Sequence, residues 1–296
     1  MKKIIWIVIV IVIVLVIIGV SRRSDQKMVT STTSVKIGMN LGLTGFGASW
    51  SENAVKGAQL AVKEINEKGG VLGKNLELII DDNHTTSKDA ITVASKHISV
   101  DKVQFMLTGW SDEVNPIIPL LNQYKIVTGN FSAGETAITK KSAYLFRTWP
   151  ADRIAVQALV TYAKEKGYKK VAMVQSIGSW ENTLVASFKE LATQQEIIVL
   201  DSVSFTSDTQ DFKTIISKLK NEKADALFAP ITSGPVERFL RQQGELGLGL
   251  PILYPVDVTG IGVPEKVPPR FLKGLVFAIY AASKEDFVNA YTKEYG

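Results

Sequence analysis

From Val35 onward, short apolar runs alternate with amphipathic stretches, and this alternation restricts the possible folds more than any other feature. In the first amphipathic stretch, Ala54, Ala58, Ala61 and Ile65 fall at the spacing of one helix face. The runs that predict strands are VKIGMNLG, LELIIDD, VQFMLTG, KIVTGN and YLFRT, then KKVAMVQ, EIIVLDSVSF, ADALFAPI, PILYPVD and LKGLVFAIY. Such alternation is typical of α/β proteins, in which helices cover both faces of a mostly parallel sheet.

Two such units follow one another along the chain. The alternation restarts after Trp149-Pro150, and a length of 296 residues with 46% apolar content suits two cores better than one. We therefore predict one lobe over 35–149, a second over 150–279, and a return into the first over 280–296. The return begins a helix with no strand after it, so the fold is expected to be truncated at its C-terminus. The other helices predicted between strands are 87–98, 112–124, 152–166, 181–194, 208–220 and 235–246.

The N-terminal segment predicts a membrane helix. Residues 4–20 form an apolar run of 17 residues flanked by Lys and Arg. As a helix, this run would span roughly 26 Å, close to the ~30 Å hydrocarbon core of a bilayer. Residues 1–23 are therefore a membrane anchor or a signal segment, and we expect an uncleaved anchor because the residues near Gly19 make a poor cleavage site. The polar, Ser/Thr-rich residues 24–34 are predicted to be a linker.

Composition excludes several classes of function. The net charge is +5, but the lysines are scattered beside glutamates and form no single block, so no nucleic-acid partner is expected. The sequence has no cysteine, which excludes disulfides, thiolate metal sites and a cysteine nucleophile. The two histidines, His84 and His97, are separated in sequence and both are predicted to lie at the surface. We expect neither a metal ion nor an organic cofactor.

The segment LGLTGFGASW, directly after the first apolar run, raises the question of a phosphate-binding loop. Its glycines, Gly42, Gly45 and Gly47, are spaced G-x-x-G-x-G, whereas a dinucleotide site needs G-x-G-x-x-G. A short-chain dehydrogenase is still an alternative, since Tyr162 and Lys166 make Y-x-x-x-K. Tyr162, however, continues an apolar helical stripe and is better explained as core. No enzymatic activity is therefore predicted.

A longer motif carries a family resemblance. The segment GLTGFGASWSENAVKGAQLAVKEINEKGGVLGKNLELIIDDN resembles the extracytoplasmic solute-binding proteins of ABC importers, specifically the branched-chain amino acid and amide-binding group. Further matching features are Trp50 at the end of the first loop, Phe146-Arg147-Thr148 before the crossover, and Phe239-Leu240-Arg241-Gln242 in the second half. The resemblance implies two Rossmann-like lobes joined by crossovers, near 148–152 and 277–282, with ligand bound in a cleft between them.

The resemblance also implies a set of ligand-binding residues. In the first lobe, Trp50 supplies an aromatic wall, while the ligand carboxylate is held by Trp110-Ser111 and by Phe131-Ser132 through backbone amides and hydroxyls. Short hydroxyls suit an anion because they donate a hydrogen bond without adding a charge. An alternative role for Ser111 is to cap the following helix.

The second lobe is expected to contribute four residues. They are Trp180 after KKVAMVQ, Thr232 and Ser233 after ADALFAPI, and Asp257 after PILYPVD. Asp257 matches the acid that pairs with the ligand ammonium, but it is offset by about one residue and is short, so it could instead cap a turn. The tryptophans favour an apolar or cationic ligand group, although each could also be ordinary packing.

The function expected from this resemblance is capture of an amino acid or amide at the extracytoplasmic face of the membrane. Closure of the lobes would trap the solute, and the loaded protein, a monomer, would deliver it to an importer permease. A ligand-sensing ectodomain of the same fold is the alternative, because lobe closure can transmit a signal as well as carry a solute.

Overall fold

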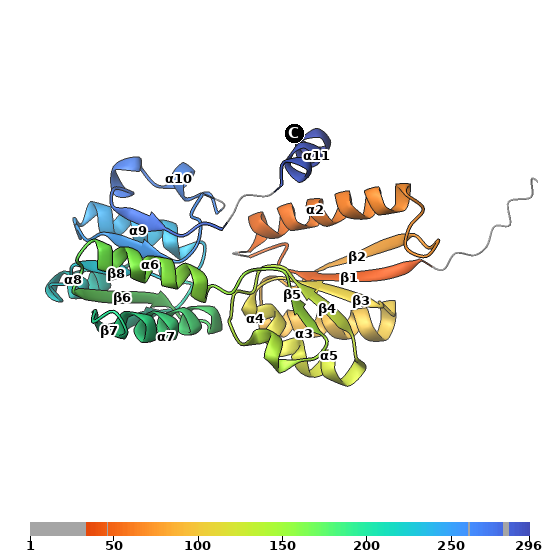
Figure 1. The fold of residues 1–296 in the computed structure, drawn as a ribbon, viewed down its shortest axis with the longest axis horizontal. Helices are drawn as coiled ribbons and strands as arrows, with labels where there is room; N and C mark the ends of the chain where they lie inside the picture. The colour runs from red at the N-terminus through yellow and green to blue at the C-terminus, as the bar shows by residue number, and fades with distance from the viewer. Residues whose placement is uncertain (1–33, 46, 260, 281–283) are drawn as a thin grey trace, which may run out of the picture.

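A computed structural model describes residues 34–45, 47–259, 261–280 and 284–296. The predicted anchor and all but the last residue of the predicted linker lie outside the described residues. No helix within the described ranges combines the length and apolarity needed to cross a bilayer. The described residues form two α/β lobes, each built on a five-stranded sheet (Figure 1).

Lobe 1 contains a parallel sheet in the order β2-β1-β3-β4-β5. Helix α2 lies on one face of the sheet, and α3, α4 and α5 lie on the other (Figure 1). The strands are β1 (Val35–Leu41), β2 (Leu76–Asp82), β3 (Phe105–Thr108), β4 (Val127–Asn130) and β5 (Leu145–Arg147), and the helices are α2 (Ala48–Glu67), α3 (Ser87–Lys96), α4 (Ser111–Val114) and α5 (Ile118–Tyr124).

Lobe 2 contains a parallel sheet in the order β10-β9-β8-β6-β7. The strands are β6 (Lys170–Ser176), β7 (Ile198–Phe205), β8 (Ala226–Phe228), β9 (Ile252–Tyr254) and β10 (Leu275–Phe277), and the helices are α6 (Arg153–Glu165), α7 (Ser179–Thr193), α8 (Lys213–Asn221), α9 (Pro235–Glu245) and α10 (Val263–Lys266). Alternate side chains of β6 enter opposite cores: Val171 and Met173 pack with α6 and α7, and Ala172 and Val174 with α8 and α9.

The sheet of lobe 1 is less evenly covered. Met106 and Leu145 are buried in the core formed with α3, α4 and α5. On the opposite face, Phe105, Val127 and Phe146 share one side of neighbouring strands and are 44%, 38% and 58% exposed. Helix α2 packs against β2, at the edge of the sheet away from these side chains.

The chain passes from lobe 1 to lobe 2 at the first predicted crossover, and residues 281 and 282 of the second predicted crossover, 277–282, lie outside the described residues. Residues 148–152 lead from β5 of lobe 1 into α6 of lobe 2. After β10, α11 (Glu285–Tyr295) lies beside α2 of lobe 1 (Figure 1). There Lys63 Nζ is 2.7 Å from a carboxylate oxygen of Glu294, and the Tyr295 hydroxyl donates to the Lys56 carbonyl at 2.8 Å.

The helix predicted over 112–124 is interrupted. Between α4 and α5 the chain forms a 3-10 turn over Asn115–Ile117. Pro116 and Pro119 explain the interruption, because proline has no backbone N–H and its ring clashes with the preceding turn of an α-helix. Other short helical turns are a π-helical turn at His97–Asp101 and 3-10 turns at Ile138–Lys141 and Pro269–Phe271.

The prediction that His97 lies at the surface is wrong. His97 is fully buried, and its Nε2 is 2.8 Å from Asp81 Oδ2. A Cβ on Gly38 would come within 2.4 Å of His97 Nδ1, so the missing side chain makes room for the ring. Burial lowers the pKa of His97.

The neighbouring Lys96 ammonium bonds the carboxylates of Asp81 and Asp101 at 2.7 and 3.0 Å. His84 is exposed, as predicted.

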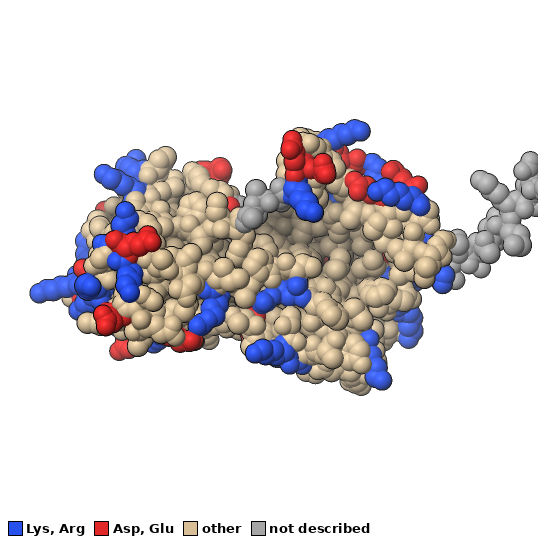
Figure 2. Space-filling view, viewed as in Figure 1, with Lys and Arg blue, Asp and Glu red and all other residues tan. Residues whose placement is uncertain are grey.

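Charges of both signs lie on the visible face of the molecule (Figure 2). Figure 2 shows Lys and Arg interspersed with Asp and Glu over both lobes on the visible face. On this face, the arrangement matches the scattered charges of the sequence (Figure 2).

Candidate functional site

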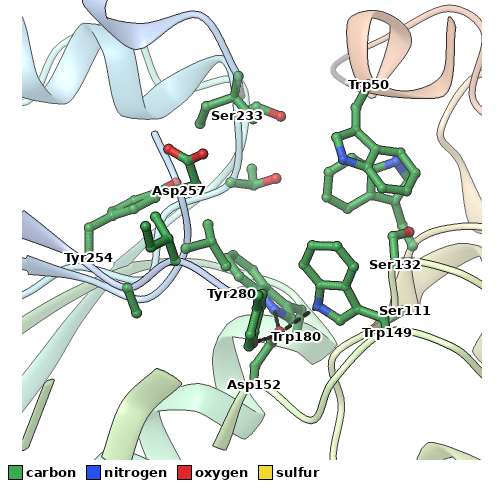
Figure 3. Close-up of a pocket in the computed structure, with 16 residues that line it drawn as sticks. Trp50, Ser111, Ser132, Trp149, Asp152, Trp180, Ser233, Tyr254, Asp257 and Tyr280 are labelled. Carbon is green, nitrogen blue, oxygen red and sulfur yellow. Dashed lines mark hydrogen bonds between the residues drawn. The ribbon is translucent and has the colours of Figure 1, made fainter. Parts of the chain in front are cut away.

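A cavity of about 300 Å³ lies where the carboxyl ends of the strands of the two lobes face one another (Figure 3). In open parallel sheets, this edge is where ligands bind. Eight of the nine residues expected at a ligand site line this cavity. They are Trp50, Trp110, Ser111, Ser132, Trp180, Thr232, Ser233 and Asp257.

Two serines form the polar part of the lobe 1 wall. Ser111 is the first residue of α4 and Ser132 follows β4. Their hydroxyl oxygens are buried and have no hydrogen-bond partner among the residues that the structure describes. The Asn130 side chain holds the Ser132 loop, since its Oδ1 accepts from the backbone amides of Ser132 and Ala133 at 3.2 and 2.7 Å. A buried hydroxyl without a partner costs about 1–3 kcal/mol, so an acceptor from a ligand would relieve this cost.

A buried acid lies beneath the same wall. Glu113 accepts hydrogen bonds from the backbone amides of Gly42 at 3.1 Å and Trp110 at 3.2 Å. Burial raises its pKa to about 8, so the side chain is mainly protonated at neutral pH. Glu113 therefore ties the loop after β1 to the loop after β3.

The aromatic part of lobe 1 is centred on Trp50. Its ring stacks on Phe131 with centroids 5.3 Å apart and planes 10° apart, and lies 5.4 Å from the ring of Trp110. The structure differs from expectation at Phe131, which does not line the cavity. Its backbone amide is used within the protein, donating to the Thr108 carbonyl at 3.2 Å. Phe131 thus supports Trp50.

The glycine-rich loop packs closely against neighbouring elements. Gly45 has a φ of +82°, which favours glycine. A Cβ on Gly42 would lie 2.2 Å from Thr85 Oγ1, and one on Gly47 would lie 2.6 Å from Trp110 Nε1. These glycines therefore let the first loop approach Thr85 and the cavity wall, a role that needs no phosphate.

The hydroxyl wall of lobe 2 follows β8. The Thr232 amide donates to Ser176 Oγ at 2.9 Å, and this hydroxyl donates in turn to Glu181 at 2.6 Å. Burial raises the pKa of Glu181 to about 7. This chain of bonds fixes the backbone of Thr232 and, next to it, Ser233.

Asp257, after β9, both lines the cavity and caps a turn. Its Oδ1 accepts from the Thr259 amide at 2.8 Å and the Thr259 hydroxyl at 2.6 Å. The turn-capping role that the sequence left open is therefore present. It does not remove the carboxylate from the cavity, so both roles are compatible with the geometry (Figure 3).

Sequence reasoning missed half of the cavity lining. The missed residues are Trp149, Asp152, Tyr254, Val256, Ile261, Ala278, Ile279 and Tyr280. Several of them lie where the chain crosses between the lobes, at 149–152 and 278–280. The proline after Trp149 marked that crossing, but nothing local indicated that side chains of the two crossings meet.

One contact joins the lobes directly at the edge of the cavity. Asp112 Oδ1, from α4 of lobe 1, accepts from Ser179 Oγ at 2.6 Å and from the Ser179 amide at 3.3 Å. Ser179 is the first residue of α7 in lobe 2. A carboxylate at this position also interacts favourably with the positive end of the helix dipole.

The Y-x-x-x-K pair lies outside the cavity. Tyr162 packs against the core of lobe 2, and Lys166 Nζ lies 5.4 Å from the centre of its ring. The pair therefore has a structural explanation in α6.

The comparisons with known proteins give one family. The family model described as periplasmic binding protein matches residues 34–296. A Leu/Ile/Val-binding protein of Rhizobium johnstonii is 27% identical over 197 residues, which are 66% of this chain and 53% of the relative. A protein of Brucella melitensis named as a Leu/Ile/Val-binding protein homologue is 26% identical and is also covered over 53% of its length. The chain thus spans about half the length of these relatives.

Two solved structures are similar in both sequence and fold. A leucine-binding protein of Thermotoga maritima superposes with a TM-score of 0.77 at 25% identity, covering 88% of this chain and 76% of that one. A solute-binding protein of an ABC transporter from Rhodopseudomonas palustris, in complex with 3,4-dihydroxybenzoic acid, has the same TM-score and identity and covers 88% and 74%. The relatives named here are solute-binding proteins, and none is a dehydrogenase.

Proposed function

Because the chain belongs to the periplasmic binding protein family, we propose that it captures a small carboxylate-bearing solute, an apolar amino acid, between its lobes. One observation carries this proposal: the buried hydroxyls of Ser111 and Ser132, which have no hydrogen-bond partner within the described ranges, meet an aromatic cavity of about 300 Å³. This volume is at the lower end of the range for ligand pockets, which suits a solute of amino-acid size.

The polar groups divide between the two ends of such a ligand. Ser111 and Ser132 would donate to the carboxylate, and Asp257 on the facing lobe would accept from the ammonium group. The apolar side chain would lie against the rings of Trp50 and Trp180. The names of the two curated relatives, which specify Leu, Ile and Val, support this ligand class.

An aromatic carboxylate is the second candidate ligand. The relative bound to 3,4-dihydroxybenzoic acid supports it, and so does the large share of aromatic side chains in the wall. Such a ligand needs the serine hydroxyls but has no ammonium group, so it would make no use of Asp257 as an ion-pair partner.

We propose that the protein delivers its solute to an ABC importer permease, which membership of the periplasmic binding protein family supports. We propose that the apolar run at residues 4–20 holds the protein at the outer face of the membrane, and that it acts as a monomer. A sensing ectodomain remains the alternative. Importer genes beside the gene for this chain would favour transport, and a neighbouring kinase or regulator gene would favour sensing.

A thermal-shift comparison on the full chain in detergent tests the ligand proposal. L-leucine, isocaproate and leucinamide differ in which charged group they carry, and 3,4-dihydroxybenzoate represents the aromatic class. Leucine at one hundred times its Kd should stabilise the protein by roughly 2.7 kcal/mol, leucinamide should not, and Asp257→Ala should weaken the leucine shift. If no zwitterion and no aromatic acid raises the melting temperature, the proposed function is wrong.

A further inference from the structure

A buried acid lies where the two lobes join. Asp152 is the last residue of the first crossing, directly before α6, and is only 3% exposed. Burial raises the pKa of its carboxyl group, and Arg147 is close enough to act electrostatically in the opposite direction. A carboxylate in such a place needs several donors to be stable.

Asp152 has three donors, each from a different part of the chain. Its Oδ1 accepts from Trp149 Nε1 at 3.0 Å and from the Tyr280 hydroxyl at 2.7 Å, and its Oδ2 accepts from Trp180 Nε1 at 2.5 Å. Trp149 lies on the first crossing, Trp180 in the first turn of α7, and Tyr280 after β10. Figure 3 shows the three bonds converging on the carboxylate.

The same three rings line the cavity, and two of them, Trp149 and Tyr280, are in contact there. Trp149 and Tyr280 meet edge to face with centroids 5.1 Å apart, and Trp149 meets Trp50 of α2 edge to face at 6.5 Å. All of these rings line the cavity. Asp152 therefore binds the polar edges of the rings, which leaves ring surface for an apolar ligand group.

The surroundings leave the carboxylate little freedom. The Asp152 amide donates to the Gly134 carbonyl at 3.0 Å, and a Cβ on Gly134 would lie 1.7 Å from Asp152 Oδ2. The loop after β4 thus has a glycine where the acid needs space. Both side-chain oxygens are already engaged, so the geometry describes a group that positions other side chains.

We propose that Asp152 is a positioning residue for solute selectivity: it fixes Trp149, Trp180 and Tyr280 as the wall that accepts the apolar side chain of the ligand. This inference rests on the proposed function. It predicts that the contribution of Asp152 to affinity grows with the size of the apolar group, although Asp152 itself makes no ion pair with the ligand.

The first test needs no ligand. Asp152→Asn in the full chain keeps one acceptor oxygen but turns an amide NH₂ toward donors, so at least one ring loses its partner. The near-UV circular dichroism of the aromatic side chains should fall, and the melting temperature should drop by roughly 2–4 °C or more. Asp257→Asn is the matched control, because that cavity acid bonds no aromatic ring among the residues that the structure describes, and it should leave the aromatic signal unchanged.

A double-mutant cycle shows whether the effect acts through the ring. On a Trp180→Phe background, which lacks the indole donor, Asp152→Asn should cost less than half of the melting-temperature shift it causes in the wild type. Full additivity, or an unchanged aromatic signal in Asp152→Asn, would overturn the positioning role whatever the ligand is.

The second test uses L-leucine and L-alanine as probes. Asp152→Asn should weaken leucine binding about tenfold or more, but alanine binding less than about threefold, because a methyl group does not reach the wall. Equal losses for both zwitterions, with isocaproate unaffected, would show instead that Asp152 pairs with the ammonium group. If the wild type binds neither zwitterion, the proposed amino-acid function fails, while the ligand-free test still decides the positioning role.

Discussion

The buried polar groups of the two cavity walls differ in their hydrogen bonding. On the lobe 1 wall, the hydroxyls of Ser111 and Ser132 have no partner within the described residues. On the wall where the chain crosses between lobes, both oxygens of Asp152 are engaged by three side chains. Buried polar groups without hydrogen bonds are rare in proteins and need an explanation. The contrast therefore separates hydroxyls that could bind a ligand from a carboxylate that positions neighbouring side chains.

This contrast predicts that removing the two kinds of group has different effects on the stability of the empty protein. Removing a hydroxyl that has no partner should not destabilise the empty protein, because no hydrogen bond is lost. Removing an acceptor that serves three donors leaves those donors buried without partners and should destabilise it. The stability of the empty protein therefore distinguishes the two walls even before a solute is identified.

The largest expected effect comes from changing Ser111→Ala and Ser132→Ala together. Hydrogen bonds to a charged group contribute about 1.5–3 kcal/mol each, so leucine affinity should fall by roughly a hundredfold or more. The melting temperature of the empty protein should stay the same or rise. Isothermal titration and thermal melts check both parts, with Ser95→Ala on α3 as a control outside the cavity. A lower melting temperature with unchanged affinity would remove the contrast between the walls.

The second effect concerns the acid beneath the lobe 1 wall. The pKa of Glu113 is about 8 in the folded protein against 4.5 in a free side chain, so the folded state holds its proton to higher pH. Glu113 therefore makes stability fall as pH rises from about 4.5 to about 8, by up to about 1.4 kcal/mol per pH unit.

Glu113→Gln should remove that dependence. Between pH 5.5 and 7.5, the decrease in unfolding free energy should shrink by about 2 kcal/mol relative to the wild type, as measured by urea denaturation at each pH. Glu245→Gln, an exposed acid in lobe 2, should leave the slope unchanged. An equal slope in Glu113→Gln and the wild type would mean that Glu113 is ionised in the folded protein and that the loops are held in another way.

The smallest effect is expected at the direct contact between lobes. Ser179→Ala removes the hydroxyl bond to Asp112, which lies in a partly exposed place, and such bonds contribute about 1 kcal/mol or less. Leucine affinity should fall about threefold or less, mainly through faster dissociation, as stopped-flow fluorescence would show. Thr193→Ala, at the other end of α7, is the control. A loss of affinity comparable to that of the serine double variant would mean that the contact between the lobes, and not the cavity, contributes most of the binding free energy.

The sequence predicted the architecture because local periodicity and strand order determine it. Each predicted strand in lobe 2 is present, and β1 to β5 appear in lobe 1. Residues shortly after strands, such as Ser111, Ser132 and Asp257, line the cavity because parallel strands present their carboxyl ends at one edge. These positions follow from connectivity alone.

The features that the sequence did not predict depend on contacts between residues far apart in the chain. Asp152 and Tyr280 are 128 positions apart but bonded, and no local pattern encodes that meeting. The burial of His97 required the space left by Gly38 on a neighbouring strand. Phe131 does not line the cavity, and sequence position cannot show that its amide is bonded to the Thr108 carbonyl.

A crystal structure of the full chain with the best-stabilising solute tests the central claim most directly. The account predicts the solute carboxylate within hydrogen-bond distance, about 2.5–3.2 Å, of both Ser111 Oγ and Ser132 Oγ, with its apolar part against the rings held by Asp152. A solute bound elsewhere, or bound in the cavity with its carboxylate turned away from the two serines, would contradict it.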